Sequence, residues 1–155
     1  MKEQVLEFIA PLTAEFEGFR ASVYKCPAGY DTIGYGRNIE SNPLSVEENK
    51  LLKDGKVSKS VAMRWLKEEL SRSYDSLHRN FKFFKALPLK KQGALVDMVY
   101  NLGFSKFKTF KNTLKEIELR DYEKAAQRLE ASLWYKQVKN RGKVIVGFIR
   151  GSDEL

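Results

Sequence analysis

The chain has 155 residues, 43% of them hydrophobic, which is long enough for one domain whose core needs no metal or disulfide to hold it. Its one cysteine, Cys26, excludes an intramolecular disulfide and a thiolate zinc cluster, and its one histidine, His78, is the only residue on which a histidine-based triad could be built. Lys and Arg number 28 against 20 Asp and Glu, a formal charge of +8. Because these charges are scattered, they fit a solvated surface with a cationic bias as well as a polyanionic partner such as nucleic acid, an anionic membrane or an anionic cell-wall polymer.

The first elements expected are helical. Residues 2–10 have the apolar spacing of a short amphipathic helix, which Pro11 ends or follows with a new turn. Residues 12–17 add a turn or two before Gly18, a residue type that commonly stops a helix.

Glu17 therefore falls at the C-terminal end of a helix. The negative end of the helix dipole and the apolar neighbours Phe16 and Phe19 are expected to raise the pKa of its carboxyl group. A raised carboxyl pKa suits a general acid that works near neutral pH. Glu17 is thus a candidate proton donor, although a solvated surface glutamate has the same local sequence.

A β-hairpin follows the helix. Residues 22–25 and 31–35 are β-prone, and the turn "CPAG" lies between them. Residues 37–44 form a loop or a third short strand. The hairpin forms the start of a small α+β region.

The hairpin brings two polar side chains together. Cys26 ends one strand and Thr32 lies early in the next, so their thiol and hydroxyl groups can point at one spot facing Glu17 and hold a water molecule. Asp31 is the competing carboxylate, but strand alternation sends Asp31 and Thr32 to opposite faces.

The rest of the chain reads as helices. Ser45 and Glu48 form a capping box that opens a helix, which Gly55 closes. A long amphipathic helix is expected over 59–79, with His78 exposed at its end. The next helix is apolar on nearly all sides, which is typical of a core helix, and amphipathic segments follow it. These segments are 91–102, 107–119, 121–135 and 140–155.

Three ordered blocks of sequence resemble the phage-type lysozymes, or endolysins. The first is Glu17-Gly18, Cys26 and Thr32, the threonine lying in "TIGYG" (32–36). The second is "ALVDMVYNLG" (94–103), similar to the central buried helix of that family. The third is "SLWYKQVKNRGK" (132–143), with Trp134, Tyr135, Gln137, Asn140 and Arg141 in place.

The resemblance implies an α+β, lysozyme-like fold and a single domain over 1–155. It implies a small α/β lobe over 12–58, a connecting helix over 59–79, and a helical lobe over 80–155 that also takes in helix 2–10, with a cleft between the lobes. It implies a glycoside hydrolase that cuts the β-1,4 bond between N-acetylmuramic acid and N-acetylglucosamine in peptidoglycan. A lytic transglycosylase acting on the same bond is the alternative, and a basic nucleic-acid-binding helical protein is a second one.

The resemblance also implies the site. Glu17, Cys26 and Thr32 are the catalytic residues, Cys26 standing where the archetype has Asp, and Arg141 supports them by pairing with Glu17. The sugar-binding residues implied are Tyr100, Asn101, Thr113, Arg128 and Asn38. Arg128 and Asn38 depart from the usual Asn and Leu, and Arg37 replaces the His common after "GYG", so a pairing of that His with a carboxylate need not persist.

The resemblance further implies partners and location. We expect a monomer that uses no cofactor and no metal, binds peptidoglycan and not nucleic acid, and depends indirectly on a holin for release. Glu3, Glu7 and Glu15 interrupt any secretory apolar segment, and no stretch approaches the ~20 apolar residues of a membrane span. We therefore expect the protein to be made in a host cytoplasm without a signal peptide or anchor and to act in the periplasm after release.

Overall fold

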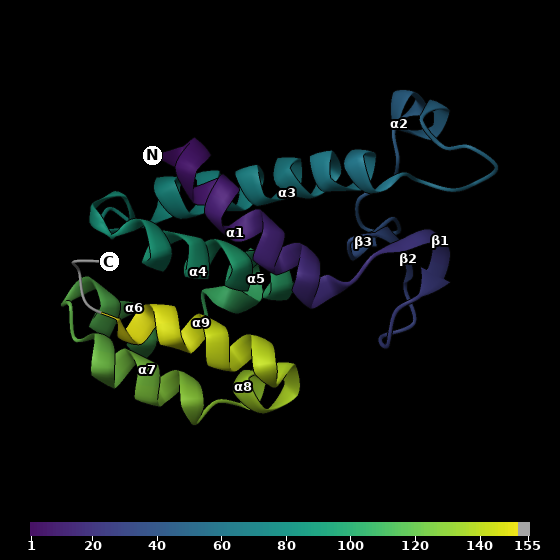
Figure 1. Ribbon diagram of the computed structural model, residues 1–155. Helices are drawn as coiled ribbons and strands as arrows, with labels where there is room; N and C mark the ends of the chain where they lie inside the picture. The colour runs from purple at the N-terminus through teal and green to yellow at the C-terminus, as the bar shows by residue number, and fades with distance from the viewer. Residues whose placement is uncertain (152–155) are drawn as a thin grey trace. The chain divides into compact units, whose positions relative to one another are not determined.

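The computed structural model describes residues 1–151, and these are mostly helical with one small antiparallel sheet, an α+β fold (Figure 1). The last four residues of the helical segment expected over 140–155 lie outside the described residues. Where described, the chain contains these helices: α1 (Lys2–Glu17), α2 (Val46–Lys50), α3 (Lys59–Asn80), the 3-10 helix η1 (Phe84–Ala86), α4 (Leu89–Leu102), α5 (Phe104–Phe107), α6 (Lys111–Glu118), α7 (Tyr122–Glu130), α8 (Leu133–Val138) and α9 (Asn140–Arg150). No helix among residues 1–151 combines the length and apolarity needed to cross a membrane.

The chain divides into two compact units. The sheet unit is Ala10–Glu69, and the helical unit is Met1–Ile9 together with the chain from Leu70 onward. The two boundaries fall within α1 and α3.

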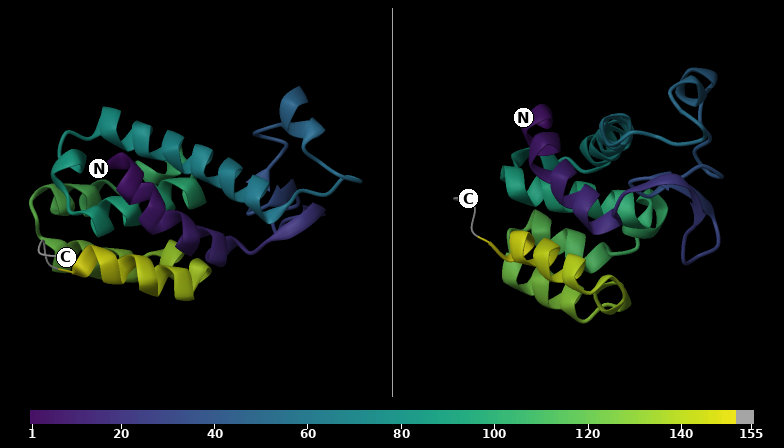
Figure 2. Two further views of the ribbon diagram at one scale, coloured as in Figure 1. Left: turned by 45° about the horizontal axis from the view of Figure 1, so that its top comes forward. Right: turned by 45° about the vertical axis from the view of Figure 1, so that its right-hand side comes forward.

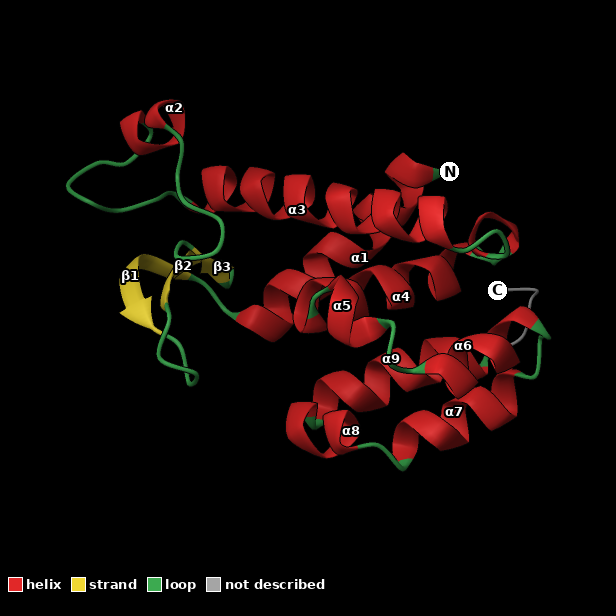
Figure 3. Cartoon of the chain, turned by 180° about the vertical axis from the view of Figure 1, so that it is seen from behind, coloured by secondary structure: helices red, strands yellow, loops and turns green. Residues whose placement is uncertain are grey.

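The sheet unit contains three strands, β1 (Arg20–Lys25), β2 (Asp31–Gly34) and β3 (Arg37–Asn38), drawn in yellow in Figure 3. They pair antiparallel in the order β1-β2-β3. Tyr24 lies opposite Thr32 in the hairpin, and Thr32 lies opposite Asn38 in the next pair. The predicted hairpin is confirmed, and residues 37–38 form a third strand.

A compact apolar core supports this sheet. Ile33, Val57, Ala62 and Trp65 are buried together, and the half-buried Phe19 and Tyr35 pack against them. Strand alternation explains the contribution of β2, because Ile33 projects to the core from a four-residue strand. The core thus holds β2, and with it the "TIGYG" segment, against α3.

Helix α1 is longer than the sequence predicted. The prediction that Pro11 ends the first helix or opens a new turn was wrong, because α1 runs without a break through Pro11 to Glu17. The proline ring is exposed, and Val5, Ile9, Ala10 and Ala14 bury the opposite face of the helix. This packing outweighs the backbone hydrogen bond that a proline removes. Gly18 then takes φ +75° and ends the helix, as expected.

Helix α2 is shorter than the sequence predicted. Ser45 and Glu48 do form the capping box, with Ser45 Oγ accepting from the Glu48 N–H at 3.0 Å and Glu48 Oε1 accepting from the Ser45 N–H at 2.9 Å. The helix ends at Lys50, however, and not near Gly55. Because no residue of α2 is buried, little beyond its cap stabilises further turns.

Helix α4 is the core of the helical unit, as its apolar sequence predicted. Nine of its residues, 91–99, are buried, and α9 lies against both α4 and α7 (Figure 2). The start of α1 packs on α4 at Gly93, where a Cβ would lie 2.8 Å from Cδ2 of Phe8. A glycine is required there by close approach, since its own backbone is helical.

A buried lysine ties α4 to the end of α9. Lys91 is 1% exposed, and its Nζ donates hydrogen bonds to the carbonyl oxygens of Ile149 at 2.8 Å, of Phe148 at 3.1 Å, and of Gly151. The last carbonyls of a helix have no partners within it, so the ammonium group caps α9. The ring of Tyr122 lies 4.0 Å from the same nitrogen.

Candidate active site

The carboxyl group of Glu17 packs against the backbone of Gly36. Glu17 is the last residue of α1 and is half-buried, and Gly36 lies in the turn between β2 and β3. A Cβ at position 36 would lie 2.8 Å from Glu17 Cδ and closer still to Oε1. Gly36 also has φ +76°, a conformation that side chains disfavour. Sequence analysis placed Glu17 correctly at the helix end but missed this role of Gly36.

Cys26 and Thr32 meet at the hairpin loop, as the spacing predicted. The Cys26 N–H donates to the Tyr30 carbonyl at 3.0 Å, which closes the loop. The Thr32 hydroxyl donates to the same carbonyl oxygen at 2.9 Å and also lies within hydrogen-bonding range of the Cys26 sulfur. Thr32 is 3% exposed, whereas Cys26 is half-buried.

The hairpin loop favours the thiolate form of Cys26. The backbone N–H of Tyr30 is the first cause that lowers the pKa of the Cys26 thiol below its ordinary value, followed by hydrogen bonds from the Ala28 backbone, the Thr32 hydroxyl and the Gly29 backbone. Partial burial opposes this shift. A lowered thiol pKa makes the sulfur a better base or charge-bearing group at neutral pH.

Tyr24 connects the Glu17 side of the candidate site with the Cys26 and Thr32 side. It lies directly opposite Thr32 in the sheet, and the Arg20 guanidinium lies over its ring at 4.5 Å. Burial raises the pKa of the Tyr24 hydroxyl above its ordinary value, and the charge of Glu17 raises it further. The charge of Arg20 opposes this rise, and the charge of Cys26 adds a smaller one. Glu17 and Cys26 thus both act electrostatically on the same phenol, which no sequence motif indicated.

Asp31 has a different environment from that of Thr32. Its carboxylate forms an ion pair with Lys25 Nζ at 2.7 Å, and its backbone N–H donates to Glu40 Oε2 at 2.6 Å. The pairing with Asp31 raises the pKa of Lys25. Asp31 thus lies at the end of the β1–β2 ladder, and its carboxylate is paired with the lysine of the opposite strand.

In the helical unit, Arg141 forms a bidentate ion pair with Asp97. Arg141 Nε donates to Asp97 Oδ2 at 3.0 Å, and Nη2 donates to Oδ1 at 2.9 Å. Arg141 lies in the first turn of α9 and Asp97 in the middle of α4, and both are buried. Sequence analysis singled out Arg141 but missed Asp97, which it passed over within an apolar helix.

The expected sugar-binding residues differ in how their side chains are engaged. Asn101 accepts a hydrogen bond from Trp134 Nε1 at 2.9 Å, and Tyr100 lies half-buried beside it in α4. Thr113 is only 5% exposed in α6. Arg128 Nε donates to Glu116 Oε1 at 2.6 Å.

Asn38, in the sheet unit, caps its own turn. Its Oδ1 accepts from the backbone N–H groups of Glu40 at 2.9 Å and Ser41 at 3.1 Å. His78, the only histidine, is exposed near the end of α3 as expected, with its ring stacked on Tyr74 at 6.2 Å.

Residues 14–153 match the family described as phage lysozyme. The chain belongs to the phage lysozyme family. Among curated relatives, "Probable T4-type lysozyme 1" of Dictyostelium discoideum is 31% identical over 86% of this chain and 88% of its own length. "Endolysin" of Acyrthosiphon pisum secondary endosymbiont phage 1 is 26% identical over 90% and 86%. "Pre-baseplate central spike protein Gp5" of Enterobacteria phage T4 is 26% identical over 91% of this chain but only 27% of its own length.

This phage lysozyme anchors the turn after Gly36 with an arginine. Arg37 is 6% exposed, and its guanidinium binds both carboxylate oxygens of Glu48, at 2.6 and 2.9 Å. It also donates to the carbonyl oxygens of Asn42 at 3.1 Å and Pro43 at 2.9 Å, and it lies 5.1 Å from the centre of the Trp65 ring. A pairing with a carboxylate therefore exists at this position despite the replacement of His.

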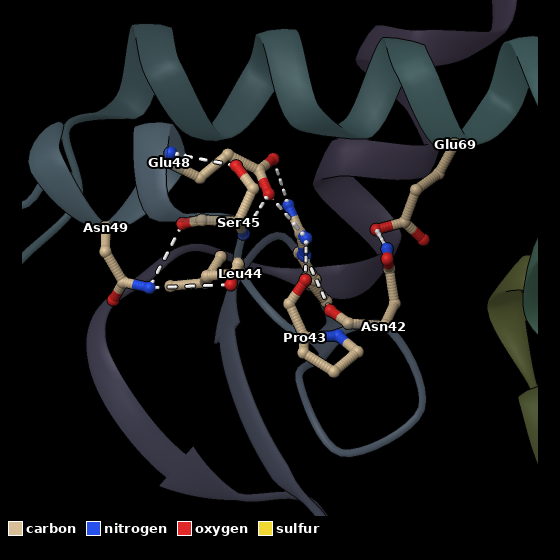
Figure 4. Close-up of polar contacts among 8 residues, drawn as sticks. Asn42, Pro43, Leu44, Ser45, Glu48, Asn49 and Glu69 are labelled. Carbon is tan, nitrogen blue, oxygen red and sulfur yellow. Dashed lines mark hydrogen bonds and ion pairs between the residues drawn. The ribbon is translucent and has the colours of Figure 1, made fainter.

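The partners of Arg37 belong to a wider polar network (Figure 4). Ser45 and Glu48 bond reciprocally at the start of α2, and Asn49 Nδ2 donates to the Ser45 carbonyl at 3.1 Å. Asn42 Nδ2 reaches Glu69 Oε1 on α3 at 3.1 Å. Because Arg37 is the first cause that lowers the pKa of Glu48 from 4.5 to about 2, the pair is charged at neutral pH.

Proposed function

We propose that this chain is a muramidase that hydrolyses the β-1,4 bond between N-acetylmuramic acid and N-acetylglucosamine in peptidoglycan. The observation that carries the proposal is the seating of the Glu17 carboxyl group on Gly36, in the turn that follows the hairpin of Cys26 and Thr32. Membership of the phage lysozyme family supports the same reaction. The relatives named lysozyme and endolysin extend over most of the chain.

Glu17 is the general acid in this proposal. It donates a proton to the glycosidic oxygen while positive charge grows on the sugar ring. Its place at the C-terminal end of α1 fits this role, because the negative end of the helix dipole favours the protonated carboxyl group. An inverting glycosidase then needs a water molecule on the opposite face of the ring.

Cys26 and Thr32 position that water. The Thr32 hydroxyl and the thiol lie together at the hairpin loop, and the lowered pKa of Cys26 brings the thiolate, a competent base, closer to neutral pH. Asp31 is the competing second carboxylate. Substitution of Asp31 by Asn should leave most activity, since its charge is engaged by Lys25, whereas near-complete loss with intact folding would transfer the role from Cys26 to Asp31.

The supporting roles follow from the resemblance. The resemblance implies that Arg141 supports Glu17, and Asp97 holds the guanidinium group of Arg141 in place. Contacts with the sugars come from Tyr100, Asn101, Thr113, Arg128 and Asn38. The division into a lobe over 12–58, a connecting helix over 59–79 and a helical lobe over 80–155 with helix 2–10 belongs to the same proposal.

The biological setting is proposed at the same level. The protein acts as a monomer, without cofactor or nucleic acid, on the anionic wall polymer that its +8 charge suits. It is made in a host cytoplasm and reaches the periplasm through a lesion opened by a separate holin.

Product analysis by mass spectrometry on purified murein tests the reaction. Reducing N-acetylmuramic acid ends are expected, and Glu17→Gln should abolish them while leaving the thermal melting temperature near that of the wild type. A 1,6-anhydro end in the product would instead identify a lytic transglycosylase. Absence of any product, together with salt-dependent binding to nucleic acid, would favour the basic nucleic-acid-binding alternative.

A further inference from the structure

A hollow in the helical unit contains no residue assigned to the proposed reaction. It encloses about 620 Å³, a volume in the range of ligand pockets. It is lined by the end of α3 and the segment that follows it, by Lys108 just after α5, and by α6. Its apolar floor consists of Phe81, Phe83 and Leu114. Its lysine rim consists of Lys82, Lys108, Lys111 and Lys115.

The lysine rim carries uncompensated positive charge. Among residues 1–151, none of the four lysines forms an ion pair, whereas Lys25, Lys124, Arg128 and Arg150 elsewhere do. Glu118 is the one carboxylate that lines the hollow in the described chain, so the lining has a net charge of 4 − 1 = +3. All four rim lysines are exposed, so their ammonium groups are available to an anion.

The phenylalanine rings of the apolar floor belong to a larger aromatic cluster. The ring of Phe81 lies 5.6 Å from that of Phe83 and 6.2 Å from that of the buried Phe107. Phe81 and Phe83 are half-buried, so each presents part of its ring to the hollow. Lys108 Nζ lies 5.3 Å from the ring centre of Phe104, which places one rim charge directly over this cluster.

A cationic rim above an apolar floor matches an anion attached to an apolar body. A hydrophilic polyanion would satisfy the lysines but leave the phenylalanine rings without a partner. An uncharged lipid would cover the rings but leave the ammonium groups without one. We propose that this pocket binds the headgroup and upper acyl chain of an anionic phospholipid at a bilayer surface, and so docks the helical unit on membranes.

Vesicle binding by the full chain tests the rim. Lys108→Gln/Lys111→Gln/Lys115→Gln should weaken binding to phosphatidylglycerol-containing vesicles by on the order of 100-fold, because each lysine near an anionic surface contributes substantially to binding. The matched control is Lys50→Gln/Lys53→Gln/Lys56→Gln, three exposed lysines of the sheet unit whose loss gives the same net charge of 8 − 3 = +5. At about 0.15 M salt, where general attraction by net charge is screened, the control should bind nearly as the wild type does, because its three lysines do not line the hollow. Equal loss in both triple variants, or equal wild-type binding to pure phosphatidylcholine vesicles, would overturn the proposal.

A fluorescent reporter tests the floor. Phe83→Trp should show a blue-shifted emission difference from the wild type when phosphatidylglycerol vesicles are added, because the new indole enters an apolar environment. If the difference spectrum stays unshifted while the protein is bound to the vesicles, the membrane contact lies elsewhere and the assignment of lipid binding to this pocket is refuted. Polyglutamate serves as the soluble polyanion. If the rim triple variant lost as much affinity for polyglutamate as for vesicles, the partner would be a polyanion and not a lipid.

An assay of murein hydrolysis distinguishes failure of this proposal from failure of the proposed function. Both triple variants should release soluble fragments from purified, membrane-free murein at the wild-type rate. Loss of hydrolysis in the rim variant alone would show that the rim serves the wall substrate, and the lipid assignment would fail.

Discussion

Replacement of Gly36 by alanine should inactivate the enzyme while leaving it folded. The backbone at Gly36 has φ +76°, and an L-residue in that region costs about 1–2 kcal/mol. For a chain of this size each kcal/mol lowers the melting temperature by roughly 2–4 °C, so the expected loss is about 2–8 °C. Strain alone therefore leaves a folded protein at room temperature.

The larger effect is on the position of Glu17, the proposed general acid. A Cβ at position 36 would lie 2.8 Å from Glu17 Cδ, whereas non-bonded carbon atoms settle at about 3.5–4.0 Å. The carboxyl group must then retreat by about 1 Å. A misplacement of about 1 Å at a reacting group costs on the order of 100-fold in rate.

Gly55→Ala is the matched control for this experiment. Gly55 has φ +74°, close to the value at Gly36, but a Cβ there would have no atom within 4 Å. Both variants should melt a few degrees below the wild type, but only Gly36→Ala should lose its rate of solubilising purified murein at 25 °C. If the two variants retained the same rate, contact between Gly36 and Glu17 would have no bearing on catalysis.

Three further predictions concern polar contacts inside each of the two units. Glu48→Gln should lower the melting temperature above pH 4.5, and the difference from the wild type should disappear as pH falls toward about 2. The reason is that the Glu48 carboxylate, whose pKa Arg37 holds low, stabilises the fold only while it is ionised. A difference in melting temperature that does not change with pH would contradict this. Lys91→Met should lower the free energy of unfolding in urea by about 1–3 kcal/mol, since the carbonyls at the end of α9 lose their cap, and an unchanged value would argue against it. Asp97→Asn should lower the free energy of unfolding by about 3 kcal/mol, because it leaves Arg141 without its buried charge partner. A decrease of less than about 1 kcal/mol would mean that this ion pair does not hold the arginine.

Elements defined by local chemistry were predictable from the sequence. The hairpin follows from two β-prone runs around "CPAG", and the start of α2 follows from Ser45 and Glu48, whose side chains bond within four residues of chain. In each case the residues that decide the structure are neighbours in sequence. The helix over 59–79 was also recognisable, because its apolar spacing is long and regular.

Elements decided by packing were not predictable in the same way. Pro11 favours a break when the helix is considered alone, but the buried face of α1 carries the helix through it. Gly55 favours a helix end, but α2 stops at Lys50 because it buries nothing. The outcome in both cases depends on what lies against the helix, which the local sequence does not contain.

The residues of the candidate site also divide into those that the local sequence revealed and those that it did not. Glu17, Cys26 and Thr32 could be named because their chemistry and spacing are visible in the sequence. Gly36 and Asp97 could not, since a glycine does not reveal which group approaches it, and one carboxylate in an apolar helix does not reveal its partner. The pairing of Arg141 with Glu17 stays a prediction that rests on the resemblance.

Arg37 forms an ion pair with Glu48 at a position where the resemblance implies a histidine. An imidazole can bind one carboxylate oxygen, whereas the planar guanidinium binds both oxygens of Glu48 and still reaches two backbone carbonyls of the following loop. Because Arg37 follows Gly36 directly, these bonds fix the turn on which the Glu17 carboxyl group rests. If Glu17 is the proton donor as proposed, Arg37 is a positioning residue that acts on it through Gly36, and the hydrogen bonds that hold the arginine all lie within the sheet unit.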